Sequence, residues 1–298
     1  MLLAGCCVQA QVTNTVIADA DAFVCTGSPN YNNGADLTGL NFGAAGNLVV
    51  APPSLAKGEF QSVIRFDLSS CLALFNSAYG SKHWIITSVA LKLTSDFGIA
   101  GVQPNNPIFP VVSGGQFVIE WLADDSWVEG TGTPSLPTTD GITYHCLPKV
   151  LAQPREILCT NTYTPPSNNV PVIYPLPLTA NLLADVVSGN EVSFRLYAVD
   201  NQIGYLFNSY KYGRGNEPKV LVVAAPCLRI TSAVLTNETC ALSGIGDTDS
   251  MVIVETATSL TVSNWTSIGT ATSDASGNIL FWDTNTTAAS RRLYRFRQ

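Results

Sequence analysis

The chain has 298 residues, of which 46% are hydrophobic and only 12% charged, and its net charge is −7. A surplus of acidic groups does not attract phosphate backbones, so nucleic acid is not an expected partner. The apolar runs are far shorter than the ~20 residues that a membrane helix needs, so we expect no transmembrane segment.

The N-terminus predicts export. The apolar start ends in Val8-x-Ala10, the small-residue pattern that precedes signal-peptidase cleavage, although a positively charged leader region is missing. Residues 3–6 also resemble a bacterial lipobox, in which Cys6 would carry lipid. An ordinary buried first strand is the third alternative. We therefore assign residues 1–18 to a signal-peptide remnant and leader, and we expect a secreted or cell-surface protein.

Cysteine spacing agrees with export. The cysteines beyond the leader fit neither a metal-ligand pattern nor a redox pattern, which favours disulfides. The sequence does not fix their connectivity. Short loops favour the pairs Cys146–Cys159 and Cys227–Cys240, and this leaves Cys25–Cys71. The alternative is free buried thiols in a reducing compartment.

Short alternating segments rich in β-branched and aromatic residues predict an all-β fold. In chain order, the first strands are expected at residues 20–25, 47–50, 61–68, 85–94, 116–122, 191–199 and 219–224. One helix is expected at 179–187, where Ser188, Gly189 and Asn190 stop it. Proline-rich stretches mark long surface connections, which often carry binding function. Strands at this spacing predict a jelly-roll β-sandwich over residues 19–225.

A second series of shorter strands follows Pro226. These strands are expected at residues 230–235, 251–255, 265–269, 279–282 and 293–296. Residues 226–298 are therefore predicted to form a small β-sandwich-like C-terminal domain.

Several stretches together resemble the DNRLRE-domain family, which is related to the carbohydrate-binding part of disaggregatases. They are Asp-Ala-Asp-Ala-Phe-Val at 19–24 with the Gly- and Asn-rich run 27–34, the arginine-bearing stretch 62–69, the stretch 86–93, Trp-Val-Glu at 127–129, and the closing pieces 194–196, 207–209 and 217–223. The chain departs from the family in the insertion 131–177 and at residues 210–212. The resemblance implies a jelly roll that binds polysaccharide at a cell surface or in matrix. The C-terminal part resembles small β modules that end secreted bacterial proteins.

Three predicted strands each carry one basic residue between apolar neighbours. Arg65, Lys92 and Arg195 therefore could share one polar sheet face and bind uronate or sulfate groups. The alternative is cross-strand pairing with Asp67, Glu120 or Glu191. A second candidate site is the glycine-rich stretch with Tyr210, Tyr212 and Arg214, because an exposed aromatic ring can stack on a sugar.

Signatures of enzymes are mostly missing. The two histidines, His83 and His145, are expected in surface positions or loops. Glu120, Asp124, Asp125 and Glu129 cluster in sequence around two tryptophans, and a glycosidase would need two such carboxylates across a cleft. A solvated loop is the favoured explanation of this cluster, and a structural Ca²⁺ site is the next alternative. Loops 27–34 and 247–249 also offer oxygen ligands for Ca²⁺, although ordinary turns account for the same residues.

These observations favour a secreted, non-enzymatic protein for polysaccharide binding or adhesion, with an acidic polysaccharide as a candidate ligand. The structural alternative is a subunit of an extracellular filament or matrix, assembled through strand pairing. A polysaccharide lyase or hydrolase is the third class.

Overall fold

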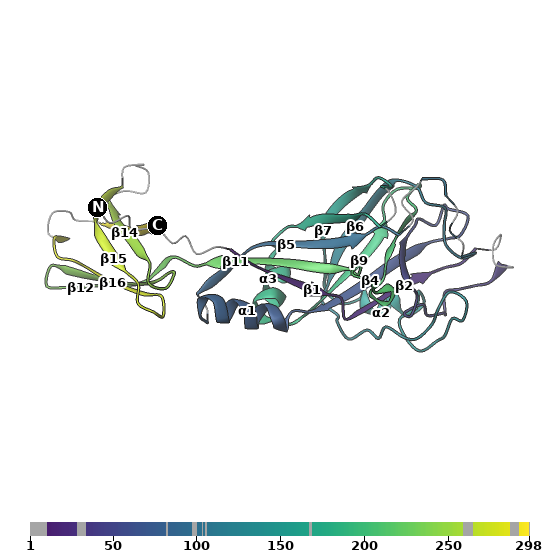
Figure 1. Ribbon diagram of the computed structural model, residues 1–298, viewed down its shortest axis with the longest axis horizontal. Helices are drawn as coiled ribbons and strands as arrows, with labels where there is room; N and C mark the ends of the chain where they lie inside the picture. The colour runs from purple at the N-terminus through teal and green to yellow at the C-terminus, as the bar shows by residue number, and fades with distance from the viewer. Residues whose placement is uncertain are drawn as a thin grey trace. The chain divides into compact units, whose positions relative to one another are not determined.

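The computed structural model describes residues 11–28, 34–81, 83–96, 100–102, 104, 106–166, 169–258, 265–286 and 292–297. It confirms the predicted all-β, sandwich-like class (Figure 1). The chain divides into two compact units. One comprises residues 14–72 and 88–222, and the other comprises the remaining parts of the chain, including everything from residue 223 onwards.

The first unit is built around two antiparallel sheets. A four-stranded sheet has the order β1-β11-β5-β8, and a five-stranded sheet has the order β2-β4-β9-β6-β7. The bounds of these strands are β1 (Val12–Ile17), β2 (Ala20–Cys25), β4 (Phe60–Asp67), β5 (Trp84–Thr94), β6 (Gly115–Leu122), β7 (Arg155–Tyr163), β8 (Pro171–Leu176), β9 (Glu191–Ala198) and β11 (Lys219–Pro226). Two further strands, β3 (Asn47–Val50) and β10 (Tyr205–Asn208), pair with each other.

The strand pairing is that of a jelly roll. Apart from β2, the strands of the two sheets pair from the ends of the sequence inwards. The first strand pairs with the last, β1 with β11, and the following pairs are β4 with β9, β5 with β8, and β6 with β7. This nesting is what two interlocked Greek keys produce. Aromatic side chains fill the space between the sheets, as in the edge-on contact of Phe117 on β6 with Tyr174 on β8, whose ring centroids are 5.3 Å apart.

Helices are few and short. They are α1 (Ser69–Tyr79), α2 (Leu147–Val150), α3 (Ala180–Ser188) and the 3₁₀ turn η2 (Tyr210–Tyr212). The sequence predicted α3 but missed α1 and α2. Thr179 caps the start of α3 by accepting a hydrogen bond from the N–H of Leu182, and Gly189 ends the helix in the left-handed region. No helix among the described residues is long and apolar enough to cross a membrane.

The structure places strands in segments that the sequence assigned otherwise. β1 lies within the expected leader, and it forms an edge of the four-stranded sheet. Residues 1–10, with the expected cleavage site and Cys6, lie outside the described residues. β8 lies within the proline-rich stretch 165–177 that was expected to be a surface connection, and β7 lies within the insertion 131–177, where no strand was expected. β8 contains two prolines, and an edge strand tolerates proline because one side of it needs no partner.

The predicted disulfides Cys25–Cys71, Cys146–Cys159 and Cys227–Cys240 are not present, because all six cysteines are free thiols. The members of each pair lie in different elements, and the thiols have other neighbours. The Sγ of Cys71 accepts a hydrogen bond from the Asn14 side chain, and that of Cys159 accepts one from Asn161. Burial raises the pKa of Cys25 to about 12 and that of Cys71 to about 11, so both thiols stay protonated at neutral pH.

The C-terminal part of the chain has two small sheets, with the orders β12-β13-β16 and β15-β14-β17. Their strands are β12 (Arg229–Thr236), β13 (Thr239–Ile245), β14 (Met251–Ala257), β15 (Thr266–Thr272), β16 (Asn278–Asp283) and β17 (Leu293–Arg297). The sequence missed only β13 among them. A small cluster of Cys240, Leu242 and Val254 forms the core, against which Phe281 and Phe296 pack.

Candidate functional site

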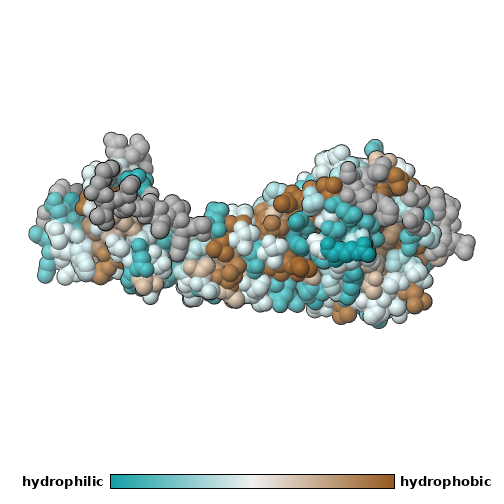
Figure 2. All heavy atoms as spheres, in the orientation of Figure 1, coloured by the Kyte–Doolittle hydropathy of each residue, from teal (hydrophilic) through white to brown (hydrophobic). Residues whose placement is uncertain are grey.

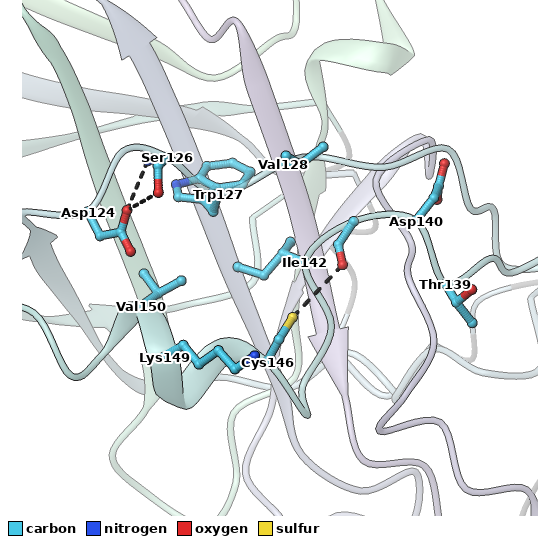
Figure 3. A pocket seen from close by; sticks show the side chains of 11 residues that line it. Asp124, Ser126, Trp127, Val128, Thr139, Asp140, Ile142, Cys146, Lys149 and Val150 are labelled. Atoms are coloured by element: carbon cyan, nitrogen blue, oxygen red, sulfur yellow. Dashed lines mark hydrogen bonds between the residues drawn. The ribbon is translucent and has the colours of Figure 1, made fainter.

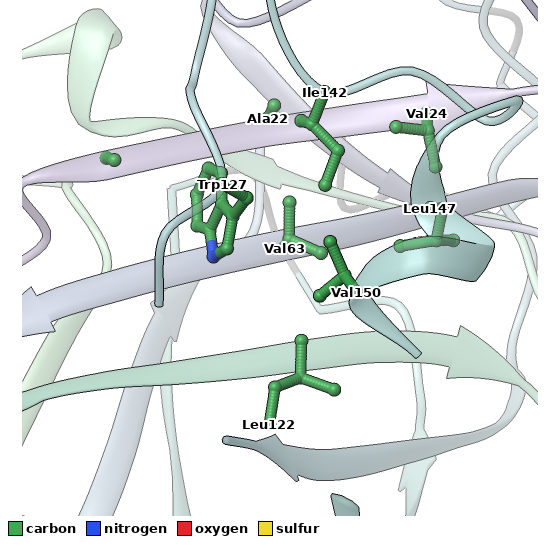
Figure 4. Close-up of a cluster of buried hydrophobic side chains, with 9 residues drawn as sticks. Ala22, Val24, Val63, Leu122, Trp127, Ile142, Leu147 and Val150 are labelled. Atoms are coloured by element: carbon green, nitrogen blue, oxygen red, sulfur yellow. The ribbon is translucent and has the colours of Figure 1, made fainter. Parts of the chain in front are cut away.

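The outer face of the five-stranded sheet is covered by the chain itself. Register places Ala22, Val63, Arg195 and Glu120 side by side across β2, β4, β9 and β6. This face is opposite to the one that carries Phe117, and it is covered by residues that follow β6. Figure 4 shows the result, a second hydrophobic cluster in which Trp127, Ile142 and residues of α2 pack on Ala22, Val24, Val63 and Leu122.

Polar contacts anchor this cover. The Nε1 of Trp127 donates a hydrogen bond of 2.9 Å to the hydroxyl of Ser193 on β9. Arg65 on β4 donates from Nη1 to the backbone carbonyl of Asp125 at 2.8 Å, and its guanidinium lies 5.5 Å from the Trp127 ring. Segment 124–128 is therefore held firmly over the sheet, and Arg65 holds it there.

The expected basic face does not form as predicted. Arg65 and Arg195 share the outer face of one sheet, but Lys92 lies on β5 in the other sheet. Arg195 is 8% exposed, and it donates to Glu120 and to Gln61, both at 2.7 Å. Arg65 forms ion pairs with Asp19 at 2.8 Å and with Glu191 at 3.5 Å. The structure thus shows the cross-strand pairing that was the alternative to a ligand-binding strip.

Of the second candidate set, Tyr210 belongs to a partly buried polar network. Tyr210 donates its hydroxyl proton to Glu129 Oε2 at 2.9 Å, and the Nζ of Lys211 lies 3.0 Å from the same oxygen. Asp21 accepts hydrogen bonds from the Ser209 hydroxyl and from the backbone N–H of Tyr210. Burial raises the pKa of Asp21 to about 7, against the effect of these two hydrogen bonds.

This network joins three separate pieces of the family resemblance: Asp21 from its opening, Glu129 from Trp-Val-Glu, and Ser209 from its end. Tyr212 and Arg214, the other two candidates of the glycine-rich stretch, follow Tyr210 in the sequence. Tyr212 is half-buried, and the guanidinium of the exposed Arg214 lies 5.6 Å from its ring.

The acidic residues that cluster in sequence do not converge on one cleft. Glu120 pairs with Arg195, Glu129 joins the Asp21 network, and Asp124 caps the turn at Ser126. His145 is exposed just before α2, and His83 lies in the other unit. Within the described ranges, no group of three His, Cys, Asp or Glu side chains could hold a metal ion. Loop 27–34, one expected Ca²⁺ loop, lies partly outside those ranges.

An open groove of about 420 Å³ lies in the covering segments themselves (Figure 3). Its apolar lining consists of Trp127, Val128, Ile142 and Val150. Its polar lining consists of Asp124, Ser126, Thr139, Asp140, Cys146 and Lys149, with Gly141 between them. Figure 3 shows Asp124 and Asp140 at opposite ends, with Lys149 along one side.

The charges of the groove are set by local hydrogen bonds. Asp140 accepts hydrogen bonds from Thr138 and Thr131, which lower its pKa to about 2, so it is ionised at any ordinary pH. Asp124 accepts from the N–H and the hydroxyl of Ser126 at 3.0 and 2.6 Å. Lys149 is exposed, and its ammonium forms no hydrogen bond or ion pair with the described part of the chain. The groove thus presents two carboxylates and one unpaired ammonium around an apolar floor.

Two smaller hollows lie elsewhere, one of about 330 Å³ beside Asn47 and Asp96 and one of about 310 Å³ beside Trp282 and Arg292. On the face shown in Figure 2, apolar residues lie in separate groups among polar ones. Sequence reasoning missed Thr139, Asp140 and Lys149. The available signal was the insertion at 131–177, because long connections on a β scaffold often carry its binding residues.

Comparisons with known proteins do not assign the chain to a family. No family model matches it, and no curated protein does. Two crystal structures of a β-glucuronidase from Ruminococcus gnavus, one of them with uronic isofagomine bound, match with TM-scores of 0.21 and 0.23 at 7% identity. The matches cover 97% and 91% of this chain but 42% and 38% of the glucuronidase chain, so this chain spans less than half of its length. Scores this low establish neither a shared fold nor a shared activity. What the fold defines is an all-β jelly roll followed by a small β unit.

Proposed function

We propose that this chain is a non-enzymatic polysaccharide-binding protein that acts outside the cell, with the groove of Figure 3 as its binding site. The observation that carries the proposal is the composition of the groove. Sugar rings present one apolar face and a rim of hydroxyl groups. An apolar floor can contact the apolar face of the ring, and exposed carboxylates beside it can accept hydrogen bonds from the hydroxyl groups.

The charge of the groove favours a neutral or amino-bearing glycan over an acidic one. Two carboxylates face a single ammonium, and the arginines of the outer sheet face, Arg65, Arg155 and Arg195, are already paired with acidic side chains. A uronate or sulfate group would therefore meet net repulsion at this site. The volume of about 420 Å³ falls within the range of roughly 300 to 1,000 Å³ found for ligand pockets.

The family resemblance gives independent support. Its separate pieces are far apart in sequence, yet Asp21, Glu129 and Ser209 meet in one network. A polysaccharide-binding jelly roll of the DNRLRE type is the class that these pieces imply, and the fold has the expected strand pairing. We propose export on the same basis.

The test is binding of the full chain to a panel of neutral, amino-bearing and acidic glycans by calorimetry. We expect Asp124→Asn to weaken binding of the selected glycan by about 10- to 100-fold, the range for losing a hydrogen bond to a charged group. Asp36→Asn is the matched control. Asp36 caps Thr38 through the same two hydrogen bonds that Asp124 makes to Ser126, and it lies outside the groove. Equal losses in both variants, or no binding by the unaltered chain, would contradict the proposal.

The enzymatic alternative has its own readout. Incubating the chain with each bound glycan and measuring new reducing ends or unsaturated ends should give no increase over buffer. Catalytic release of such ends would replace a binding function with hydrolysis or elimination.

A further inference from the structure

β12 is one of the four edge strands of the two C-terminal sheets, and the others are β15, β16 and β17. β12 pairs with β13 along one side, and within the described chain no strand pairs with its other side. In an antiparallel ladder, every second residue points its N–H and C=O groups away from the neighbour. β12 therefore offers a row of unpaired backbone groups.

The side chains of β12 leave the small core open at the same edge. Leu235 lies opposite Cys240 and Ala233 opposite Leu242, both of which belong to the buried cluster. Leu235 nevertheless is 69% exposed, and Val234 on the other face is 56% exposed. An additional strand beside β12 would cover Leu235 and close the core.

β12 has little of the protection that edge strands normally carry. Between residues 230 and 236 it has no charge and no proline, and β-branched residues are frequent, although its ladder has a bulge between Ile230 and Ser232. By contrast, the edge strand β17 carries Arg295 and Arg297, both paired with Glu255. The edge strand β15 also has no charge and no proline, but it exposes no large apolar side chain, whereas β12 exposes Val234 and Leu235.

The sequence around β12 complements itself. Arg229 precedes the apolar stretch of β12. Glu238 follows this stretch in a tight turn, in which Asn237 and Glu238 both have positive φ. When two such strands run antiparallel, the start of each meets the end of the other. Arg229 of each copy then lies close to Glu238 of the other, at both ends of the pair.

We propose that β12 pairs antiparallel with β12 of a second copy of this chain, so that two three-stranded sheets join into one continuous sheet. The pair has two-fold symmetry, which closes on itself and gives a dimer instead of an open filament. Backbone hydrogen bonds supply affinity, as in other strand additions, and Leu235 is covered on both sides of the axis. This inference does not depend on the groove or on its ligand.

The first test measures the mass of the full chain by sedimentation across a range of concentrations. A reversible dimer is expected. Leu235→Lys should give a monomer, because a charge would enter the new interface. The control is Leu280→Lys on β16, the opposite edge of the same sheet, where the side chain is 47% exposed. That variant should remain a dimer. A chain that is monomeric throughout, or one dissociated by Leu280→Lys and not by Leu235→Lys, would overturn the proposal.

The second test examines the direction of pairing through charge reversal. Arg229→Glu should weaken the dimer about tenfold, since two rim ion pairs become repulsive contacts. Adding Glu238→Arg to the same chain should restore the original affinity. Absence of recovery in the double variant would overturn the antiparallel register, and regular filaments in negative-stain images would overturn the closed two-fold.

Discussion

Arg195 and Glu120 form an ion pair that is almost wholly inside the protein, with side-chain exposures of 9% and 4%. Removing one member of a buried pair leaves the other charge without compensation and typically costs about 3 to 5 kcal/mol. We expect Arg195→Met to lower the free energy of unfolding in urea by that amount. Arg155→Met is the control, because Arg155 is 47% exposed at 3.8 Å from the same glutamate and should cost less than about 1 kcal/mol. Equal losses of unfolding free energy in the two variants would show that burial does not determine how much this ion pair contributes to stability.

Asp21 makes stability depend on pH. Its pKa of about 7 in the folded chain lies above its usual value of 3.8, so the folded state holds a proton that the unfolded state releases. The contribution of Asp21 is therefore present below about pH 4, falls as the pH rises to about 7, and then stays constant. The total change has an upper limit of about 4 kcal/mol.

The measurement compares the urea midpoints of unfolding of the unaltered chain and of the Asp21→Asn variant between pH 4 and pH 8, which is about the range over which Asp21 titrates. The difference between the two proteins should shift in favour of the variant as the pH rises. A constant difference over this range would show that Asp21 titrates alike in both states.

The alternation of apolar and polar residues correctly predicted the sheet face on which a single side chain lies. The pattern placed Arg65 on the face opposite to Ile64 and Phe66, and the structure agrees, because both apolar neighbours are fully buried. Alternation says nothing of what covers a face. That Trp127 and α2 lie on the outer face depends on long-range packing, which no local pattern encodes.

At the scale of elements, the cap of α3 can be tested directly. Thr179→Ala removes the acceptor for the N–H of Leu182 and should destabilise the protein by about 1 kcal/mol. Thr179→Ser retains the hydroxyl and should cost clearly less. If both variants unfold at the same urea concentration, the cap contributes nothing measurable.

β2 and β3 were predicted to the residue, whereas β1, β7, β8, β10 and β13 were missed. β8 was missed because proline normally indicates a break, and its place at the sheet edge is a property of the whole fold. α1 was missed although Cys71, Phe75 and Tyr79 recur at helical spacing and are buried. The edge position of β8 is a property of the whole fold, whereas the stripe of α1 was present in the local sequence.

For the whole molecule, free thiols predict that reductant has no effect on stability. Each disulfide would add about 3 kcal/mol by restricting the unfolded chain. We expect equal urea midpoints with and without reductant, and thiol titration of the unfolded chain should detect at least six of its eight cysteines as free thiols. A lower urea midpoint in the presence of reductant would show that disulfides stabilise the folded chain, as the sequence had predicted.

The site itself was only partly predictable. Tyr210 and the motif residues were singled out from sequence, and the structure brings Asp21, Glu129 and Tyr210 together. The groove depends instead on the approach of segments 124–128 and 139–150, which both lie in the long connection between β6 and β7 and meet over a sheet. Sequence could indicate the insertion but not where it would fold back.

Hydrogen–deuterium exchange of the full chain, with and without the glycan selected from the panel, tests the account most directly. Bound glycan should slow exchange in segments 124–128 and 139–150 and leave residues 205–215 and the C-terminal strands unchanged. Protection centred on Tyr210–Tyr212 or on β12 to β17, with none at the groove, would contradict it.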